Sequence, residues 1–299
     1  MGNVWRADRP QRGRYRQFMQ CDIDILGEAS NLAEIDLILA TTTLLGKLDF
    51  TGFTIRLNDR RFLKAMAAYS GFPEESWDTV FIILDKMDKI GLEGVENELL
   101  EEGFAKDSVE KYLALFRDNP DDVSGVRRIR EILGDYLSAE YADNLVQIME
   151  AASAAGKADF RIAFDPTLVR GMSYYTGPIF EVSMDAYGGS VGGGGRYDEM
   201  IGKFLGQNTP ACGFSIGFER IVMLLLEEDF KVPGADEKKV YLLEKKLPDA
   251  KRQEVFEKAM EERLTGATVD IEIMKKNKKF QKEQLAEQGY TDIVEVFAE

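Results

Sequence analysis

The sequence predicts an α+β fold in which helices flank a sheet, with a helical insertion and a C-terminal α/β domain. Residues 4–27 alternate with the period of strands, and strand patterns return from residue 160. The stretch between them has a helical pattern, and strands and helices alternate after residue 237. We therefore expect four parts: 1–72 and 158–231 as the two halves of a core, 73–157 as the helical insertion, and 237–299 as a partial α/β domain.

The elements of the first three parts follow from local patterns and breakers. The core is expected to open with two strands within 4–27 around a loop at Pro10 and Gly13. A helix over 33–45, with Asn31 as a possible N-cap, should follow. A strand over 53–57 should then turn at Asn58-Asp59 into a helix over 60–68. In the insertion we expect breaks near 91–94, 103 and 119–120. The second half of the core is expected to contain strands over 160–164 and 174–184, a glycine-rich bend, a strand over 210–216 and a helix over 218–228.

The C-terminal part alternates strand and helix after a linker at 232–236. The expected elements are strands over 239–244, 267–273 and 293–297, with helices over 248–265 and 279–288. Such alternation is typical of a small α/β domain. The last strand ends the chain, so we expect a domain that lacks the elements to complete its sheet.

Composition excludes several kinds of chemistry. The 299 residues include no histidine, which removes imidazole acid–base catalysis and imidazole metal ligands. Cys21 and Cys212 lie far apart, so we expect a reducing, cytoplasmic setting and no zinc site. No apolar run is long enough to span a bilayer, and no signal peptide is visible. An enzyme of this composition would depend on arginines, carboxylates and a hard cation.

The net charge of −15 argues against a nucleic-acid partner only until its distribution is considered. Residues 74–150 hold 20 acidic and 8 basic side chains, which accounts for most of the excess. Residues 1–20 carry five arginines against one aspartate, and basic residues cluster at 275–279. The two ends of the chain could therefore contact RNA.

The N-terminal strand pattern carries the clearest functional information. One predicted face carries Arg14, Arg16, Phe18, Gln20, Asp22 and Asp24. A core face would not hold so much charge, because unpaired buried charge is costly. A surface that binds an anion, a flat ring and an ammonium group has this character.

Three further clusters are ambiguous when each is taken alone. Arg170-Gly171 and the tyrosine pair Tyr174-Tyr175 fit ordinary structure, or a cation placed beside developing negative charge. The run at 187–198 contains four consecutive glycines, which fit a bend or a strand that leaves space for a small molecule; we favour the second. Glu219-Arg220 follows a Gly-x-x-x-Gly strand, where Arg220 could pair on the surface or lie over a nucleotide base.

Together and in this order, the four segments resemble the class II histidyl-tRNA synthetase family. The matching motifs are 6–24, 168–175, 192–198 and 213–220. The resemblance covers essentially the whole chain and implies an antiparallel sheet flanked by helices, with a C-terminal anticodon-binding-like domain.

The resemblance also implies a role for each matching residue. For ATP it implies Arg6 at the α-phosphate, Arg14 at the distal phosphates, and Phe18 and Arg220 on the two faces of adenine. For histidine it implies Gln20 and Asp24 at the amino and carboxylate groups, and Tyr174 and Tyr175 at the side chain. Arg170 would stabilise charge at the reacting carboxylate and, with Arg6, would be catalytic; Arg9 and Gln11 would contact the acceptor end of tRNA.

The implied reaction joins L-histidine to tRNA(His) through histidyl-adenylate, with ATP and Mg²⁺. The amino acid carboxylate is itself the nucleophile, so the absence of histidine side chains fits. Asp8, Met19 and Ser173 depart from common family residues without replacing a phosphate ligand. The family's first motif and dimer interface would precede Gly2, so a homodimer is implied for the full-length protein. We expect this shorter chain to be a poor enzyme on its own.

Two other functions fit part of the pattern. A histidine-binding regulatory subunit of ATP phosphoribosyltransferase shares the fold, but usually lacks the extra α/β part. A purely RNA- or protein-binding module would not need two phosphate-side arginines together with Phe18. Joint binding of ATP and histidine distinguishes the synthetase from both.

Overall fold

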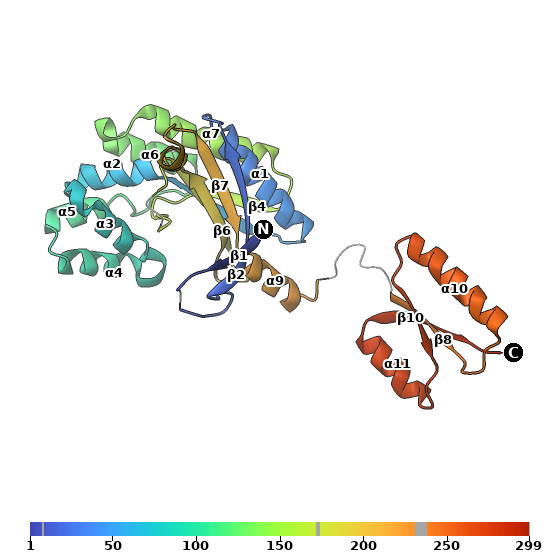
Figure 1. Ribbon diagram of the computed structural model, residues 1–299. Helices are drawn as coiled ribbons and strands as arrows, with labels where there is room; N and C mark the ends of the chain where they lie inside the picture. The colour runs from blue at the N-terminus through green and yellow to red at the C-terminus, as the bar shows by residue number, and fades with distance from the viewer. Residues whose placement is uncertain (8, 172–173, 231–237, 299) are drawn as a thin grey trace. The chain divides into compact units, whose positions relative to one another are not determined.

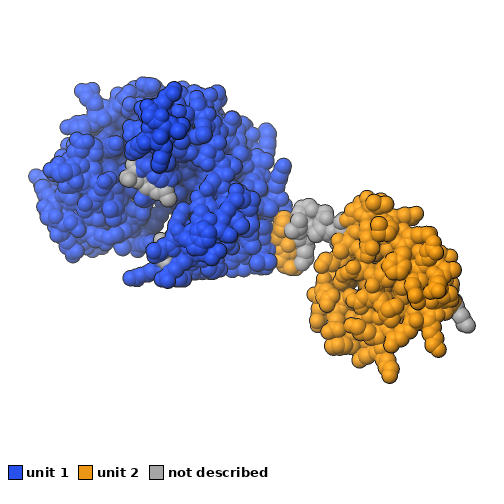
Figure 2. All heavy atoms as spheres, in the orientation of Figure 1, with its two compact units in different colours: residues 1–228 blue, residues 229–299 orange. Residues whose placement is uncertain are grey.

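The computed structural model describes residues 1–7, 9–171, 174–230 and 238–298. The chain forms two compact units, residues 1–228 and 229–299, coloured separately in Figure 2. Each unit has its own hydrophobic core, and each is described by itself. The four-part division of the chain stays a prediction.

A seven-stranded sheet organises the first unit, in the order β1-β2-β7-β6-β5-β3-β4. Neighbouring strands are antiparallel except β3 and β4, which are parallel. The predicted α+β class with an antiparallel sheet is therefore confirmed. The strands are β1 (Gly2–Trp5), β2 (Gln17–Leu26), β3 (Phe53–Asp59), β4 (Phe160–Phe164), β5 (Pro178–Met184), β6 (Gly189–Arg196) and β7 (Ala211–Ile216).

Helices pack on this sheet from several parts of the chain. Helix α1 (Leu32–Lys47) contacts β7, and α7 (Ala139–Ala155) contacts both α1 and β4 (Figure 1). Buried Arg196 of β6 holds α1 in place, because its guanidinium binds both carboxylate oxygens of Glu34 at 2.6 and 2.7 Å. Helix α9 (Phe218–Glu227) contacts β2 and β6 and begins directly after β7.

The residues between β3 and β4 are helical, as predicted. Their elements are α2 (Arg60–Ser70), η1 (Glu74–Ser76), α3 (Trp77–Leu84), α4 (Met87–Glu101), α5 (Lys106–Leu113), α6 (Val123–Leu133), η2 (Gly134–Tyr136) and α7. The predicted breaks are confirmed. Gly91 interrupts α4 with a φ of 67°, Gly103 follows α4, and Asn119-Pro120 separates α5 from α6.

Two predicted helix starts differ in detail. Strand β3 continues through Asp59, whose carboxylate accepts the backbone N–H of Arg61 and so caps α2. Asn31 occupies the N-cap position of α1, but the prediction that it caps the helix is wrong. Its φ of −72° and ψ of 0° lie outside the extended region of a capping residue, and its amide donates to Gln147 instead.

One boundary predicted within the second half of the core is wrong. Strand β5 begins at Pro178 rather than at residue 174. The glycine-rich stretch, for which a bend and a strand were both considered and the strand was favoured, forms strand β6, which pairs with β5 on one side and β7 on the other. Glycine has a low strand propensity, but ladders on both edges hold the backbone extended. Helix α8 (Met200–Leu205) was not expected from the sequence.

The second unit contains a three-stranded parallel sheet in the order β10-β8-β9. Its elements are β8 (Lys238–Leu243), α10 (Asp249–Leu264), β9 (Val269–Ile273), α11 (Lys278–Glu287) and β10 (Tyr290–Val296). The predicted alternation is confirmed, whereas the linker predicted at 232–236 lies outside the described residues. Across the described ranges, no helix has the length and apolar character needed to cross a bilayer.

Candidate active site

One cavity of about 220 Å³ collects most of the predicted site residues. Its walls come from the β1–β2 hairpin, the loop before β5, strand β6 and the start of α9. These segments are far apart in sequence, and the sheet brings them together (Figure 1). The predicted residues on the cavity wall are Arg6, Arg14, Phe18, Gln20, Arg170, Tyr174, Tyr175 and Arg220.

The register of the sheet forms a polar row, of which two members, Gly193 and Ser215, line this cavity. Arg56, Glu181, Gly193, Ser215 and Asp22 are paired in turn across five neighbouring strands. Paired residues on adjacent strands point to the same face, so this row is polar except at its centre. The central glycine leaves a gap over the sheet.

Arg170 fills that gap. A Cβ added at Gly193 would lie 2.3 Å from Nη1 of Arg170, so the guanidinium occupies the space that a side chain would take. The same Nη1 donates to Glu181 at 3.0 Å, and Arg170 has a φ of 53°. This left-handed conformation is costly for a residue other than glycine and is often found at functional sites.

Arg6, Phe18 and Gln20 form the hairpin side of the cavity. The Arg6 guanidinium lies 5.1 Å from the Phe18 ring centroid and donates to Gln20 at 3.2 Å. Phe18 and Gln20 lie on one face of β2 together with Asp22 and Asp24. The predicted polar face is therefore present in β2 from Phe18 to Asp24, whereas Arg14 and Arg16 precede the strand. Its members Arg14, Phe18 and Gln20 line the cavity.

Arg220 projects from the first turn of α9 and is held by backbone carbonyls. Its Nη1 donates to Ser190 O at 2.6 Å, and its Nε donates to Gly13 O at 3.4 Å. Burial lowers the pKa of Arg220, and the neighbouring positive charges of Arg14 and Arg170 lower it further. The guanidinium groups of Arg6, Arg14, Arg170 and Arg220 on one cavity wall create a site for a strongly anionic ligand.

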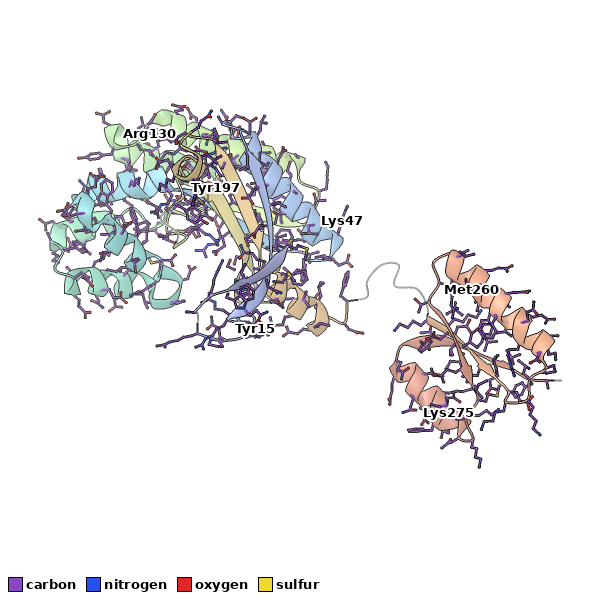
Figure 3. The ribbon with its side chains drawn as sticks, viewed as in Figure 1. Tyr15, Lys47, Arg130, Tyr197, Met260 and Lys275 are labelled. Atoms are coloured by element: carbon purple, nitrogen blue, oxygen red, sulfur yellow. The ribbon has the colours of Figure 1, made fainter. Side chains whose placement is uncertain are left out.

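Aromatic side chains close the other end of the cavity. The rings of Tyr174 and Tyr175 lie 4.6 Å apart, and Tyr174 meets Tyr197 edge to face at 6.0 Å. Burial raises the pKa of the Tyr174 hydroxyl. In Figure 3, labelled Tyr197 and Tyr15 lie toward opposite ends of the central strands. The tyrosine pair therefore offers aromatic ring surfaces beside the arginines.

Three predicted site residues are not on the cavity wall. The carboxylate of Asp24, which pairs with Gly213 two residues along the ladder from the Asp22–Ser215 pair, accepts a hydrogen bond from the Tyr197 hydroxyl. Arg9 and Gln11 are exposed in the loop between β1 and β2. Asp8 and Ser173, which differ from the residues common in the family, lie outside the described residues.

The sequence reasoning missed three side chains at the site. Glu219 lines the cavity and accepts the backbone N–H of Met19 at 3.0 Å, Glu181 pairs with Arg170, and Tyr187 lies against Arg220. Only Glu219 had a sequence signal, an acid in the first helical turn beside Arg220. A second cavity of about 500 Å³ shares Arg14, Ser190 and Arg220 with the first.

An antiparallel sheet flanked by helices, with arginines from separated motifs around one cavity, defines the class II aminoacyl-tRNA synthetase catalytic fold. Two solved structures share the fold of this chain. Histidyl-tRNA synthetase from Nostoc sp. PCC 7120 aligns with a TM-score of 0.83 at 24% identity, over 100% of this chain and 69% of that one. An ATP phosphoribosyltransferase regulatory subunit/histidyl-tRNA synthetase from Bacillus halodurans C aligns with a TM-score of 0.77 at 20% identity, over 99% and 72%.

Sequence similarity identifies the family within this class. The histidyl-tRNA synthetase family model matches residues 1–221. Histidine--tRNA ligase from Leifsonia xyli subsp. xyli is 51% identical over 74% of this chain and 52% of its own length. The enzyme of the same name from Aeropyrum pernix is 40% identical over 76% and 51%. The chain belongs to the histidyl-tRNA synthetase family, and it spans about half the length of these relatives.

Proposed function

We propose that this chain takes part in the ATP-dependent ligation of L-histidine to tRNA(His) through a histidyl-adenylate intermediate. The observation that carries the proposal is the convergence of Arg6, Arg170 and Arg220 on one cavity beside a tyrosine pair. A triphosphate needs concentrated positive charge, and an imidazole needs a small, partly apolar compartment. Because the chain matches about half of its relatives' length, the activity, substrates and partners of the whole protein are part of this proposal.

ATP would occupy the arginine-rich side of the cavity. Arg6 would bind the α-phosphate, and Arg14, which lines both cavities, would bind the distal phosphates. The adenine would stack between Phe18 and Arg220, since an aromatic ring and a planar guanidinium both pack on a base. This arrangement would leave the α-phosphorus beside Arg170.

Histidine would occupy the other side of the cavity. Gln20 on the cavity wall and Asp24 behind it would hold its α-amino group and carboxylate region, and Tyr174 and Tyr175 would enclose its side chain. The histidine carboxylate would then attack the α-phosphorus, and pyrophosphate would leave. Arg170 would stabilise the charge that develops between the two reactants, so no protein base is required.

Magnesium would be held chiefly by the ATP phosphates. Mg²⁺ often binds through one or two protein carboxylates together with substrate phosphates, and Glu219 is the carboxylate on the cavity wall. The donor set therefore fits the ion, which would supply additional charge neutralisation. Glu219 also fixes the hairpin strand through its hydrogen bond from the Met19 amide.

The acceptor end of tRNA(His) would approach over the exposed loop that carries Arg9 and Gln11. Its terminal ribose hydroxyl would then attack the histidyl carbonyl of the adenylate, forming the ester while AMP leaves. Homodimer formation by the whole protein and a cytoplasmic location complete the proposal. The regulatory-subunit alternative is not favoured, because the close sequence relatives are named ligases.

Calorimetric titration with a non-hydrolysable ATP analogue and L-histidine tests the proposal. We expect the analogue to bind, and histidine to bind more tightly when the analogue is present. L-alanine, which cannot fill the tyrosine-lined compartment, serves as the control and should not bind. Histidine binding without any nucleotide binding would contradict the proposal and support a regulatory role.

A further inference from the structure

Tyr187 lies in the turn between β5 and β6, outside the residues to which the resemblance gives a role. Its backbone N–H donates to Met184 O at 3.2 Å, and Gly188, with a φ of 74°, completes the turn. This turn presents the Tyr187 ring to the loop between β1 and β2. The Tyr187 ring therefore lies between the β1–β2 loop and Arg220 of α9, which both belong to the proposed ATP site.

The loop holds Tyr187 from two directions. The Tyr187 hydroxyl donates to Arg12 O at 2.9 Å, and the Arg12 guanidinium lies 5.8 Å from the ring centroid. Arg12 is fixed in turn by Glu227 of α9 at 2.6 Å. Gly13 packs so closely that an added Cβ would lie 2.9 Å from Cε2 of Tyr187 and 3.1 Å from Cγ of Arg220.

Arg220 completes the arrangement. Its guanidinium carbon lies 5.3 Å from the Tyr187 ring centroid, within the range of a cation–π interaction. Its guanidinium also donates to the carbonyls of Ser190 and Gly13. Arg14 and Arg170 repel it, so the ring and the two carbonyls offset that repulsion and fix the guanidinium plane.

We infer that Tyr187 is a positioning residue that joins the β1–β2 loop to Arg220, through its hydroxyl on the loop side and its ring on the arginine side. The inference rests on the proposed function where it concerns ATP. It assigns separate tasks to two parts of one side chain. The hydroxyl restrains the β1–β2 loop, and the ring holds the Arg220 guanidinium in the plane that would stack on the adenine of ATP.

Two variants separate these tasks. Tyr187→Phe keeps the ring and removes the hydrogen bond to Arg12 O, whereas Tyr187→Leu removes both contacts. Limited trypsin digestion with mass spectrometry measures cleavage after Arg12 and Arg14, and calorimetry measures the affinity for a non-hydrolysable ATP analogue. Tyr290→Phe is the matched control, because it removes a tyrosine–carboxylate hydrogen bond in the other compact unit.

We expect Tyr187→Phe to be cleaved about fivefold faster than the wild type, with the ATP-analogue affinity changed less than about twofold. We expect Tyr187→Leu to be cleaved at least as fast and to bind the analogue about five- to tenfold more weakly. The control should match the wild type in both assays. Melting curves confirm that each variant is folded.

Wild-type cleavage rates in Tyr187→Phe would overturn the loop part of the inference, even if Tyr187→Leu fails to fold. Wild-type affinity in a folded Tyr187→Leu would overturn the part that concerns Arg220. If the wild type binds no ATP analogue, the proposed function and the Arg220 part both fail. The proteolysis result then still decides the loop part.

Discussion

At the scale of single residues, the site depends on which side chains are absent as well as on those present. Gly193 lies in the middle of a row whose other members are Arg56, Glu181, Ser215 and Asp22. The row is continuous across five strands, and only its glycine leaves room for Arg170. A glycine that weakens the strand locally thus creates the place of the arginine.

The substitution Gly193→Ala tests whether the space over Gly193 is needed to place Arg170. The new methyl group would lie within 2.3 Å of the Arg170 guanidinium and 2.9 Å of Phe180 O, so we expect Arg170 to be displaced. We predict about tenfold weaker binding of a histidyl-adenylate analogue, equivalent to about 1.4 kcal/mol. Calorimetric titration measures the affinity.

Gly189→Ala in the same strand is the matched control. Its added Cβ would lie 3.8 Å or more from its neighbours, an ordinary contact distance, so its affinity should stay near that of the wild type. Equal affinities for Gly193→Ala and the wild type would show that Arg170 does not depend on this gap.

At the scale of elements, Arg56 joins the helical segment to the sheet. From β3 it binds Asp88 of α4 at 2.6 Å and Asp165 after β4 at 2.5 Å, and it lies 3.8 Å from Glu181 of β5. The side chains of Arg56, Asp165 and Glu181 are only 15–20% exposed. Glu181 also binds Arg170, so the same cluster reaches the cavity.

Arg56→Met should destabilise the protein, because it leaves Asp165 and Glu181 partly buried beside each other without their shared cation. We predict a loss of about 2 kcal/mol in the free energy of unfolding at neutral pH, below the value for a fully buried pair. Urea denaturation followed by circular dichroism measures it.

Arg161→Met on the adjacent strand β4 is the comparison. Its ion pair with Asp121 is about 60% exposed on both sides, so its loss should cost less than about 1 kcal/mol. A smaller effect for Arg56→Met than for Arg161→Met would contradict the role given to Arg56.

Local patterns were sufficient to predict most of these elements, but not the pairing between them. The strand at 160–164, the breaks at Gly91 and Gly103, and the alternation of the second unit follow from periodicity and breaker residues. For the glycine run the sequence left a bend and a strand open, and strand β6 forms because ladders to β5 and β7 hold its backbone extended.

The site residues that depend on pairing between distant elements could not be predicted either. Arg6, Arg170 and Arg220 stand in recognisable motifs, and the cavity contains all three. Glu181 and Tyr187 could not be found, because their partners Arg170 and Arg12 are specified only by strand register and by a turn.

At the scale of the whole molecule, the cavity belongs to one of the two compact units. Every residue on its wall lies between Arg6 and Arg220, and the core clusters of residues 1–228 and 229–299 share no member. The proposed chemistry of adenylate formation therefore depends on the first unit.

A chain of residues 1–228 should consequently keep the ligand affinity of residues 1–299. We predict a Kd for the histidyl-adenylate analogue within about twofold, because none of the lining groups is removed. Parallel titrations of the two chains provide the measurement. A loss of binding from a folded 1–228 chain would show that the second unit contributes to the site.

The proposed adenylate chemistry requires that the guanidinium groups of Arg6, Arg170 and Arg220 act on one ligand. Titration of a histidyl-adenylate analogue into Arg6→Ala, Arg170→Ala and Arg220→Ala tests it, with Arg117→Ala, an exposed arginine between α5 and α6, as the control. We predict that each of the three loses about tenfold or more in affinity, as expected for charge-assisted hydrogen bonds, while the control binds like the wild type. Wild-type affinity in all three site variants would contradict the account.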